Sequence, residues 1–124
     1  MDKVKKCMDL HALIAIASGN EKFAKYLNQD FIITDITLAE FCSILLKKFG
    51  EENSQYWHDK LEKYSVNVDK RILVNAVKFK HLLGKKNVSF SDAVNYSYCI
   101  HNECVFVTPD KEFEGMENVE FVGK

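Results

Sequence analysis

The chain has 124 residues, of which 47% are hydrophobic and 28% charged, and its formal net charge is −1. This length suits a single domain over residues 1–124, and the composition excludes a disordered chain. The balanced charge argues against a protein that coats nucleic acid by bulk electrostatics. No apolar run reaches the roughly 18 residues that span a membrane. Because Asp9 and His11 interrupt the N-terminal apolar run, we expect a cytoplasmic protein without a signal peptide.

Short apolar runs and amphipathic runs alternate along the chain. Asp69 is expected to cap the start of one helix, and Gly50 and Gly84 to end two others. In chain order, the predicted elements are a strand over 4–10, helices over 11–17 and 21–28, a strand over 31–34, helices over 36–50 and 51–64, a strand over 65–68, helices over 69–84 and 89–103, and strands over 105–108 and 119–123.

This order predicts the fold class. Strands that alternate with helices form α/β folds, in which helices cover both faces of a parallel sheet. The strands FIIT (31–34) and VFVT (105–108) are apolar without alternation, as is typical of parallel strands buried on both sides. We therefore expect a three-layer α/β/α sandwich with a central, mostly parallel β-sheet.

The four cysteines, at positions 7, 42, 99 and 104, form no C-x-x-C pair. Cys99, His101 and Cys104 could suggest a zinc site, but the second ligand pair that such sites use is missing. Buried free thiols in a reducing compartment are the favoured interpretation.

Four acidic residues lie near element ends: Asp9, Glu40, Asp92 and Asp110. Each has a local structural explanation. Asp9 could cap the next helix, and Asp110 follows a proline as in a turn. Thr37 and Glu40 match a capping box, with Thr37 as N-cap and Glu40 reaching back, and Asp92 ends a weaker version of the same pattern.

The predicted sheet gives these acids a common location. Because parallel strands end at one edge, Asp9, Glu40 and Asp110 are expected at that edge, where open α/β proteins bind ligands. Asp92 is placed less directly, since a helix precedes its segment. Clustered carboxylates repel one another and are neutralised by protons or by a cation. Oxygen ligands alone favour Mg²⁺ or Mn²⁺, ions suited to phosphoryl chemistry.

Four segments together resemble the PIN-domain family, in the short form of the VapC-type toxins of prokaryotic toxin–antitoxin pairs. The segments are MDLHALI, ITLAEF, VSFSDAVNY and VFVTPDKEF. The most specific parts are the T-x-D-x-x-F signature at Thr108, Asp110 and Phe113, and the S-x-x-D-A segment that ends at Ala93.

The resemblance implies a Mg²⁺- or Mn²⁺-dependent endoribonuclease that hydrolyses RNA phosphodiester bonds. It implies that Asp9, Glu40, Asp92 and Asp110 are the catalytic, metal-binding acids, with Asn95 and Thr108 in support. On this basis, alanine at Asp9 or Asp92 is expected to abolish cleavage while leaving the fold intact.

The first motif departs from the family pattern. Small hydroxyl or amide residues usually follow its acid, whereas Leu10 and His11 follow Asp9 here. His11 could replace the missing hydroxyl, reach a substrate phosphate, or simply face solvent at a helix start. Two alternative functions therefore stay open: a catalytically impaired PIN-fold module that binds RNA or protein, and an RNA-processing PIN nuclease without an antitoxin.

The resemblance also implies an antitoxin partner and a homodimer. Tyr56 and Trp57 lie in a polar helix and are candidate partner-facing aromatic residues, although core packing explains them equally well. RNA must approach an acidic pocket, so nearby lysines are candidate contacts, above all the Lys85–Lys86 pair. The candidates are Lys47, Lys48, Lys85, Lys86 and Lys111.

Overall fold

The computed structural model describes residues 4–123, so residues 1–3 and 124 of the expected domain lie outside the described part. Over this range, five strands form one sheet in the order β3-β2-β1-β4-β5, and every neighbouring pair is parallel. The prediction of a parallel sheet is confirmed. The strands are β1 (Lys6–Met8), β2 (Phe31–Thr34), β3 (Ser65–Val66), β4 (Val105–Thr108) and β5 (Val119–Phe121).

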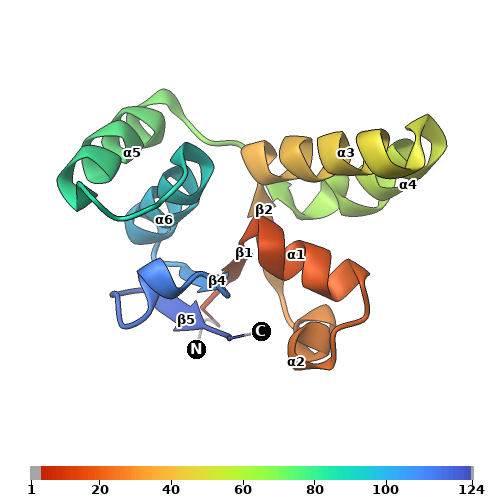
Figure 1. Ribbon diagram of the computed structural model, residues 1–124, viewed down its shortest axis with the longest axis horizontal. Coiled ribbons are helices and arrows are strands. Elements are labelled where there is room, and N and C mark those ends of the chain that lie inside the picture. The colour runs from red at the N-terminus through yellow and green to blue at the C-terminus, as the bar shows by residue number, and fades with distance from the viewer. Residues whose placement is uncertain (1–3, 124) are drawn as a thin grey trace.

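The helices connect these strands and pack in two groups (Figure 1), with α3 beside α4 and α5 beside α6. Three short 3₁₀ segments complete the order. The α-helices are α1 (Leu10–Ala17), α2 (Glu21–Ala24), α3 (Asp35–Phe49), α4 (Glu51–Leu61), α5 (Lys70–Leu83) and α6 (Phe90–Asn102), and the 3₁₀ segments are η1 (Lys25–Asn28), η2 (Glu62–Tyr64) and η3 (Lys111–Phe113).

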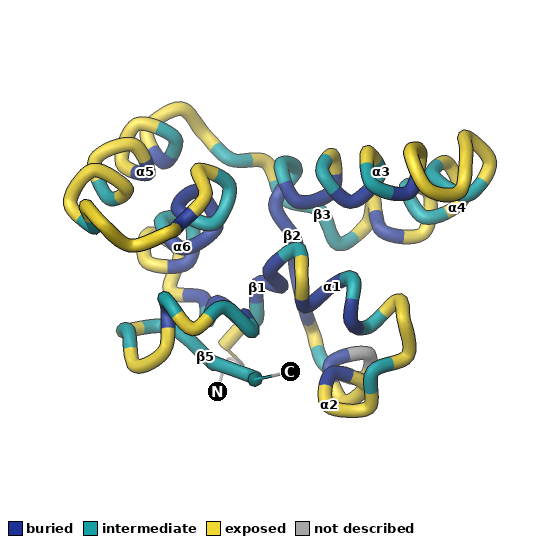
Figure 2. The backbone as a smooth tube through the Cα atoms, viewed as in Figure 1, coloured by how far each residue is buried: buried dark blue, intermediate teal, exposed yellow. Residues whose placement is uncertain are grey.

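The strands supply side chains to two separate cores. Because successive strand residues point to opposite faces, Met8 and Val107 pack with α1 to α4, while Cys7 and Phe106 pack with α5 and α6. Figure 2 shows the central strands largely buried, with exposed surface on the outer helices. Helices therefore cover both faces of the sheet, and the expected three-layer α/β/α architecture is confirmed.

Several predicted boundaries shift by a few residues. The first strand is shorter than predicted, because Asp9 already caps α1. The predicted helix over 21–28 is divided into α2 and η1, and the predicted helix over 51–64 ends as an α-helix at Leu61, with η2 as its last turn. Helix ends that tighten into 3₁₀ turns are common.

The capping box predicted at Thr37 and Glu40 is wrong. The N-cap of α3 is Thr34, the last residue of β2, whose hydroxyl accepts the backbone N–H of Thr37 at 3.3 Å. The strand runs directly into the helix, so the N-cap lies three residues earlier than expected. Glu40 consequently lies in the second turn, where it has no capping role.

None of the helices within residues 4–123 is both long enough and apolar enough to cross a bilayer. Of the two candidate aromatic residues on α4, Trp57 packs edge-on against Phe41, with ring centroids 5.9 Å apart, and joins the core under α3. Tyr56 is half exposed. Tyr56 is therefore the more accessible of the two to a partner.

Candidate active site

The carboxyl ends of three neighbouring strands bring acidic residues to one edge of the sheet. Asp9 directly follows β1, the helix that carries Glu40 directly follows β2, and Asp110 follows β4 after a single proline. Asp92 lies in the first turn of α6. Because α6 returns the chain to the start of β4, its own start must lie at the opposite, carboxyl edge of the sheet. The topology therefore places all four residues at the same edge.

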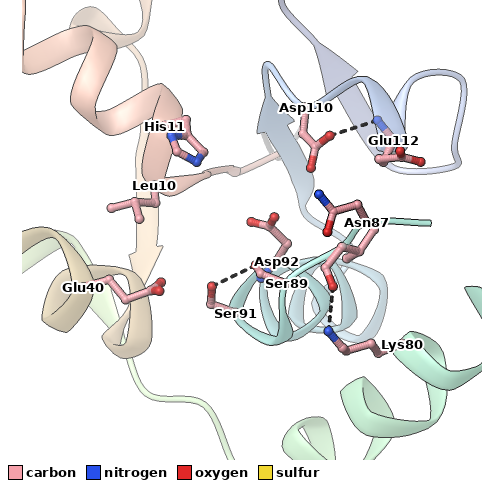
Figure 3. Close-up of a pocket in the computed structure, with 11 residues that line it drawn as sticks. Leu10, His11, Glu40, Lys80, Asn87, Ser89, Ser91, Asp92, Asp110 and Glu112 are labelled. Atoms are coloured by element: carbon pink, nitrogen blue, oxygen red, sulfur yellow. Dashed lines mark hydrogen bonds between the residues drawn. The ribbon is translucent and has the colours of Figure 1, made fainter. Parts of the chain in front are cut away.

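Three of the four acids line one cavity of about 500 Å³ (Figure 3). Glu40 enters it from α3, Asp92 from α6 and Asp110 from the turn after β4. The remaining lining residues are mostly polar: Leu10, His11, Lys80, Asn87, Val88, Ser89, Ser91 and Glu112. The sequence predicted a shared pocket for the acids but did not identify most of these other lining residues.

Asp9 does not line the cavity, because its side chain is fully buried. As the N-cap of α1 it accepts the backbone N–H groups of His11 and Ala12, the latter at 3.3 Å. Its other oxygen accepts the hydroxyl of Thr108 at 2.7 Å. Burial raises the pKa of the Asp9 carboxyl despite these hydrogen bonds. The residue is thus a rigidly held acid at the base of the site.

Thr108 supplies the hydroxyl that the first motif lacks. Its side chain donates to Asp9 and accepts the backbone N–H of Asp110 at 3.0 Å. One threonine at the end of β4 therefore orients two of the four acids. Leu10 and His11 are not required to hold the Asp9 carboxylate, apart from the backbone N–H of His11.

Glu40 is held in the site without a hydrogen-bonding partner. Its Oε1 atom is buried and unpaired within the described part of the protein. A buried carboxylate oxygen without a donor is costly unless a proton or a cation satisfies it. The side chain is therefore available to bind a cation.

The electrostatics of Asp92 show how closely the acids interact. Burial raises the pKa of its carboxyl to about 7, with further contributions from the charges of Asp9, Asp110 and Glu40. Such a group is readily protonated near neutral pH, or ionises fully when a cation is bound. The charges of all three other acids therefore reach Asp92.

Asp110, which follows the only proline of the chain, both caps a turn and lines the cavity. Its Oδ1 atom accepts the backbone N–H of Glu112 at 3.0 Å and caps η3, which forms the turn after β4. The same side chain lines the cavity opposite His11 (Figure 3). The turn thus fixes the direction of a carboxylate that faces the cavity.

Asn95 contacts none of the four acids. Its buried amide accepts the hydroxyl of Thr34 at 2.6 Å and donates to the hydroxyl of Thr37 at 2.9 Å. These bonds join α6, which carries Asp92, to the start of α3, which carries Glu40. Asn95 therefore fixes the relative position of two acids from a distance.

We expect Asn95→Ala to destabilise the protein by about 2–4 kcal/mol, because it removes both hydrogen bonds of the buried amide, leaves the Thr34 hydroxyl only its longer bond to the Thr37 hydroxyl at 3.3 Å, and opens a small cavity. Urea denaturation measures this change. Asn102→Ala, on the exposed end of the same helix, is the matched control and should change stability by only about 0.5 kcal/mol. Equal stabilities of the two variants would show that the buried network contributes little.

None of the five predicted RNA-contacting lysines lines the cavity. The Lys86 ammonium donates to the carbonyl of Glu112 at 3.2 Å, which ties the loop before α6 to η3, and Lys85 and Lys111 are exposed nearby. Lys47 and Lys48 belong to the last turn of α3, about two turns beyond Glu40. These two lysines are the least well placed of the five.

Sequence reasoning missed the cavity residues on the loop before α6 and on α5. The ammonium of Lys80 donates to the carbonyl of Val88 at 2.8 Å, which fixes this loop against α5, and Asn87 and Ser91 complete the wall. Exposed polar residues in loops carry no periodic signal. Only the short distance in sequence from Asp92 could have suggested Asn87 and Ser91.

Among the described residues, the only three metal-ligating side chains whose donor atoms all lie within 4.8 Å of one another are His58 and Asp59 on α4 and Glu62 at the start of η2. They are largely exposed and lie within one helical turn, as surface ion pairs do. The four predicted acids are less tightly grouped than these three side chains. Their all-carboxylate chemistry and the unpaired Glu40 oxygen nevertheless fit a hard divalent cation.

Comparison with solved structures finds the same fold in several toxin–antitoxin systems. A toxin-antitoxin complex from Klebsiella pneumoniae matches with a TM-score of 0.77 and 19% identity, covering 93% of this chain and 95% of that chain. VapC20 from Mycobacterium tuberculosis, a toxin that cleaves the sarcin-ricin loop, matches with a TM-score of 0.74 and 14% identity, covering 96% and 98%.

A DNA-bound VapBC from Salmonella typhimurium has a TM-score of 0.77 and 18% identity, covering 98% of both chains. At these identities the likeness shows the fold. No curated protein sequence matches significantly. The PIN domain family model matches residues 6–119, nearly the whole chain. The chain therefore belongs to the PIN domain family.

Proposed function

We propose that the protein is a Mg²⁺- or Mn²⁺-dependent endoribonuclease that hydrolyses RNA phosphodiester bonds, and that residues 1–124 work as one nuclease domain. The observation that carries the proposal is the arrangement of the acids. Three carboxylates line one cavity, and burial raises the pKa of one of them, Asp92, to about 7, with further contributions from the charges of Asp9, Asp110 and Glu40. Structural capping does not require four acids from four separate segments to interact in this way.

In this proposal Asp9, Glu40, Asp92 and Asp110 hold the cation. A divalent ion in such a site lowers the pKa of a bound water and neutralises charge that develops on a phosphate. Thr108 keeps Asp9 and Asp110 in fixed orientations, which limits the reorganisation needed during the reaction. Glu40 offers an oxygen that no donor occupies, and Asp92 releases its proton when the site fills.

The decisive experiment measures cleavage of a fluorescent single-stranded RNA by purified protein with Mg²⁺, with Mn²⁺ and with a chelator. We expect the chelator to reduce the rate at least about 100-fold, since the ion supplies both activation of water and charge stabilisation. Restoring Mn²⁺ should restore the rate. An undiminished rate in chelator would exclude the proposed metal dependence.

The alternative of a catalytically impaired module depended on the altered first motif. The hydrogen bond from Thr108 to Asp9 weakens that alternative, because the acid is steadied without a hydroxyl at the next position. Metal binding distinguishes the two functions. An impaired module need not bind Mn²⁺, whereas a nuclease must.

We further propose that the protein is the toxin of a VapBC-type pair, assembles as a homodimer and is inhibited by an antitoxin. The support is the likeness to complexes described as toxin–antitoxin, VapBC and FitAB. Co-expression with the product of a small adjacent reading frame should suppress cleavage. An RNA-processing nuclease without an antitoxin would be unaffected by any such neighbour.

We propose that Lys85, Lys86 and Lys111 attract the RNA backbone, since they are exposed around the cavity. Replacing Lys85 and Lys86 together by glutamine should weaken RNA binding and reduce the slope of log affinity against log salt by about one to one and a half. Fluorescence anisotropy at several salt concentrations measures both quantities. The matched control replaces Lys47 and Lys48, and an equal loss in both double variants would contradict the proposal.

A further inference from the structure

Apart from its acids, the cavity has two sides of different chemistry. Leu10 and His11, at the start of α1, form one side, and Asn87, in the loop before α6, lies on the other (Figure 3). Asp92 and Asp110 lie between them in the same view. The two sides therefore present an imidazole and a carboxamide to a molecule in the cavity.

The His11 ring makes no hydrogen bond or ion pair among residues 4–123. His11 is exposed, and its bond to Asp9 uses the backbone N–H rather than the ring. Leu10 beside it is partly buried against the core and also lines the cavity. The two residues therefore present an aromatic ring and an apolar surface to whatever occupies the cavity.

Asn87 is exposed, but the backbone around it is held on both sides. Lys80 donates to the carbonyl of Val88 at 2.8 Å, and the backbone N–H of Val88 donates to the carbonyl of Lys86 at 3.0 Å. The amide of Asn87 points toward the acids in Figure 3. A carboxamide in a fixed position offers a donor and an acceptor side by side, which suits the edge of a nucleobase.

We infer that His11 and Asn87 bind an unpaired nucleotide of the RNA beside the scissile phosphodiester, a conclusion that rests on the proposed nuclease function. The base stacks on the His11 ring, with Leu10 as apolar support, and its edge hydrogen-bonds with the Asn87 amide. Base faces and edges are accessible in this way only in single-stranded RNA. The cavity of about 500 Å³ is in the usual range for a small ligand.

The test measures binding without cleavage, using Asp92→Asn protein with Mg²⁺ and fluorescent oligonucleotides of A, C or U, together with a blunt RNA duplex. His11→Ala should weaken single-strand binding about tenfold, because one stacked base contributes roughly 1–3 kcal/mol. His11→Phe should restore affinity, since it keeps an aromatic face. Asn87→Ala should reduce the differences in affinity between the three oligonucleotides.

The matched controls are His101→Ala and Asn75→Ala, which replace the same residue types around a separate hollow between α5 and α6. They should leave binding unchanged. If His11→Ala binds like the controls, or if His11→Phe does not restore affinity, the inference is wrong even when the native protein cleaves RNA. If no form binds RNA and the native protein does not cleave it, the proposed function fails as well.

Discussion

Replacing Asp92 by asparagine is expected to abolish RNA cleavage and to make the metal-free protein more stable. The loss of cleavage follows from removing one charged oxygen ligand from a site that we propose holds a divalent ion. The gain in stability follows because the ionised carboxyl of Asp92 is disfavoured by its burial and by three other acids. Asparagine has nearly the same shape and no charge, so it relieves this repulsion.

The gain should depend on pH in a definite direction. Below about pH 4, Asp92 is protonated in both the folded and unfolded states, so it contributes no pH dependence. Between about pH 4 and 7 the unfolded state ionises while the folded state keeps its proton, and the folded protein loses stability progressively. The loss is complete above pH 7 and amounts to at most about 4 kcal/mol, because each pKa unit corresponds to 1.36 kcal/mol.

Thermal denaturation of the native protein and Asp92→Asn in chelator, at pH 5 and pH 8, measures this effect. The two proteins should differ more at pH 8, and added Mg²⁺ should stabilise the native protein more than the variant. Asp59→Asn, at an exposed position on α4, is the control and should leave cleavage intact. Cleavage by Asp92→Asn at the native rate, or a native protein that gains no stability from Mg²⁺, would contradict the metal site.

The fold was predictable because the signals that specify it are local. Uniformly apolar strands such as 31–34 and clear helix stops at Gly50 and Gly84 are visible in one sequence, and their order fixes the architecture. The start of α3 was not predictable in the same way. A capping box at Thr37 matches the local pattern as well as the true cap at Thr34 does, and only the length of the paired strand decides between them.

The residues of the candidate site were likewise predictable only where a local signal in the sequence placed them. The edge rule for parallel sheets predicted the grouping of Asp9, Glu40 and Asp110, because it needs only the end of each strand. Asp92 required a further step, namely that the helix before β4 must begin at the edge where that strand ends. Asn87 could not be found, since the sequence gives no sign of which face an exposed loop amide occupies.

The earlier start of α3 also has a consequence for chemistry. If Glu40 had capped the helix, its carboxylate would be engaged by backbone N–H groups. One turn further along, it instead has a buried oxygen without a donor. The residue that looked most structural in the sequence is therefore the one most available to a cation.

Asp9, in contrast to Glu40, has a structural role in addition to its proposed catalytic one. We therefore expect Asp9→Ala to destabilise the protein as well as abolish cleavage. From sequence alone, alanine was expected to leave the fold intact. Asp9 caps α1 through two backbone N–H groups and accepts the buried hydroxyl of Thr108. Asp9→Asn keeps the cap, because asparagine and aspartate are equivalent at this position. It removes the charge and turns the oxygen that faces Thr108 into an amide NH2, which can donate to the Thr108 hydroxyl oxygen, so it should abolish cleavage while preserving the fold.

Comparing Asp9→Ala with Asp9→Asn separates the contribution of Asp9 to stability, as the N-cap of α1, from its proposed role in cleavage. Asp9→Ala should be less stable than Asp9→Asn by about 2–3 kcal/mol, the sum of a lost N-cap and an unpaired buried hydroxyl. Urea denaturation in chelator measures the difference, and neither variant should cleave RNA.

Asp69 provides the matched pair, since it caps α5 through the backbone N–H of Ile72 at 3.1 Å and lies outside the cavity. Asp69→Ala should be about 1 kcal/mol less stable than Asp69→Asn, and both should cleave RNA normally. Equal stabilities of the two Asp9 variants would contradict the structural role, and cleavage by Asp9→Asn would contradict the catalytic one. Because the two outcomes are independent, the experiment can assign Asp9 to either role, to both or to neither.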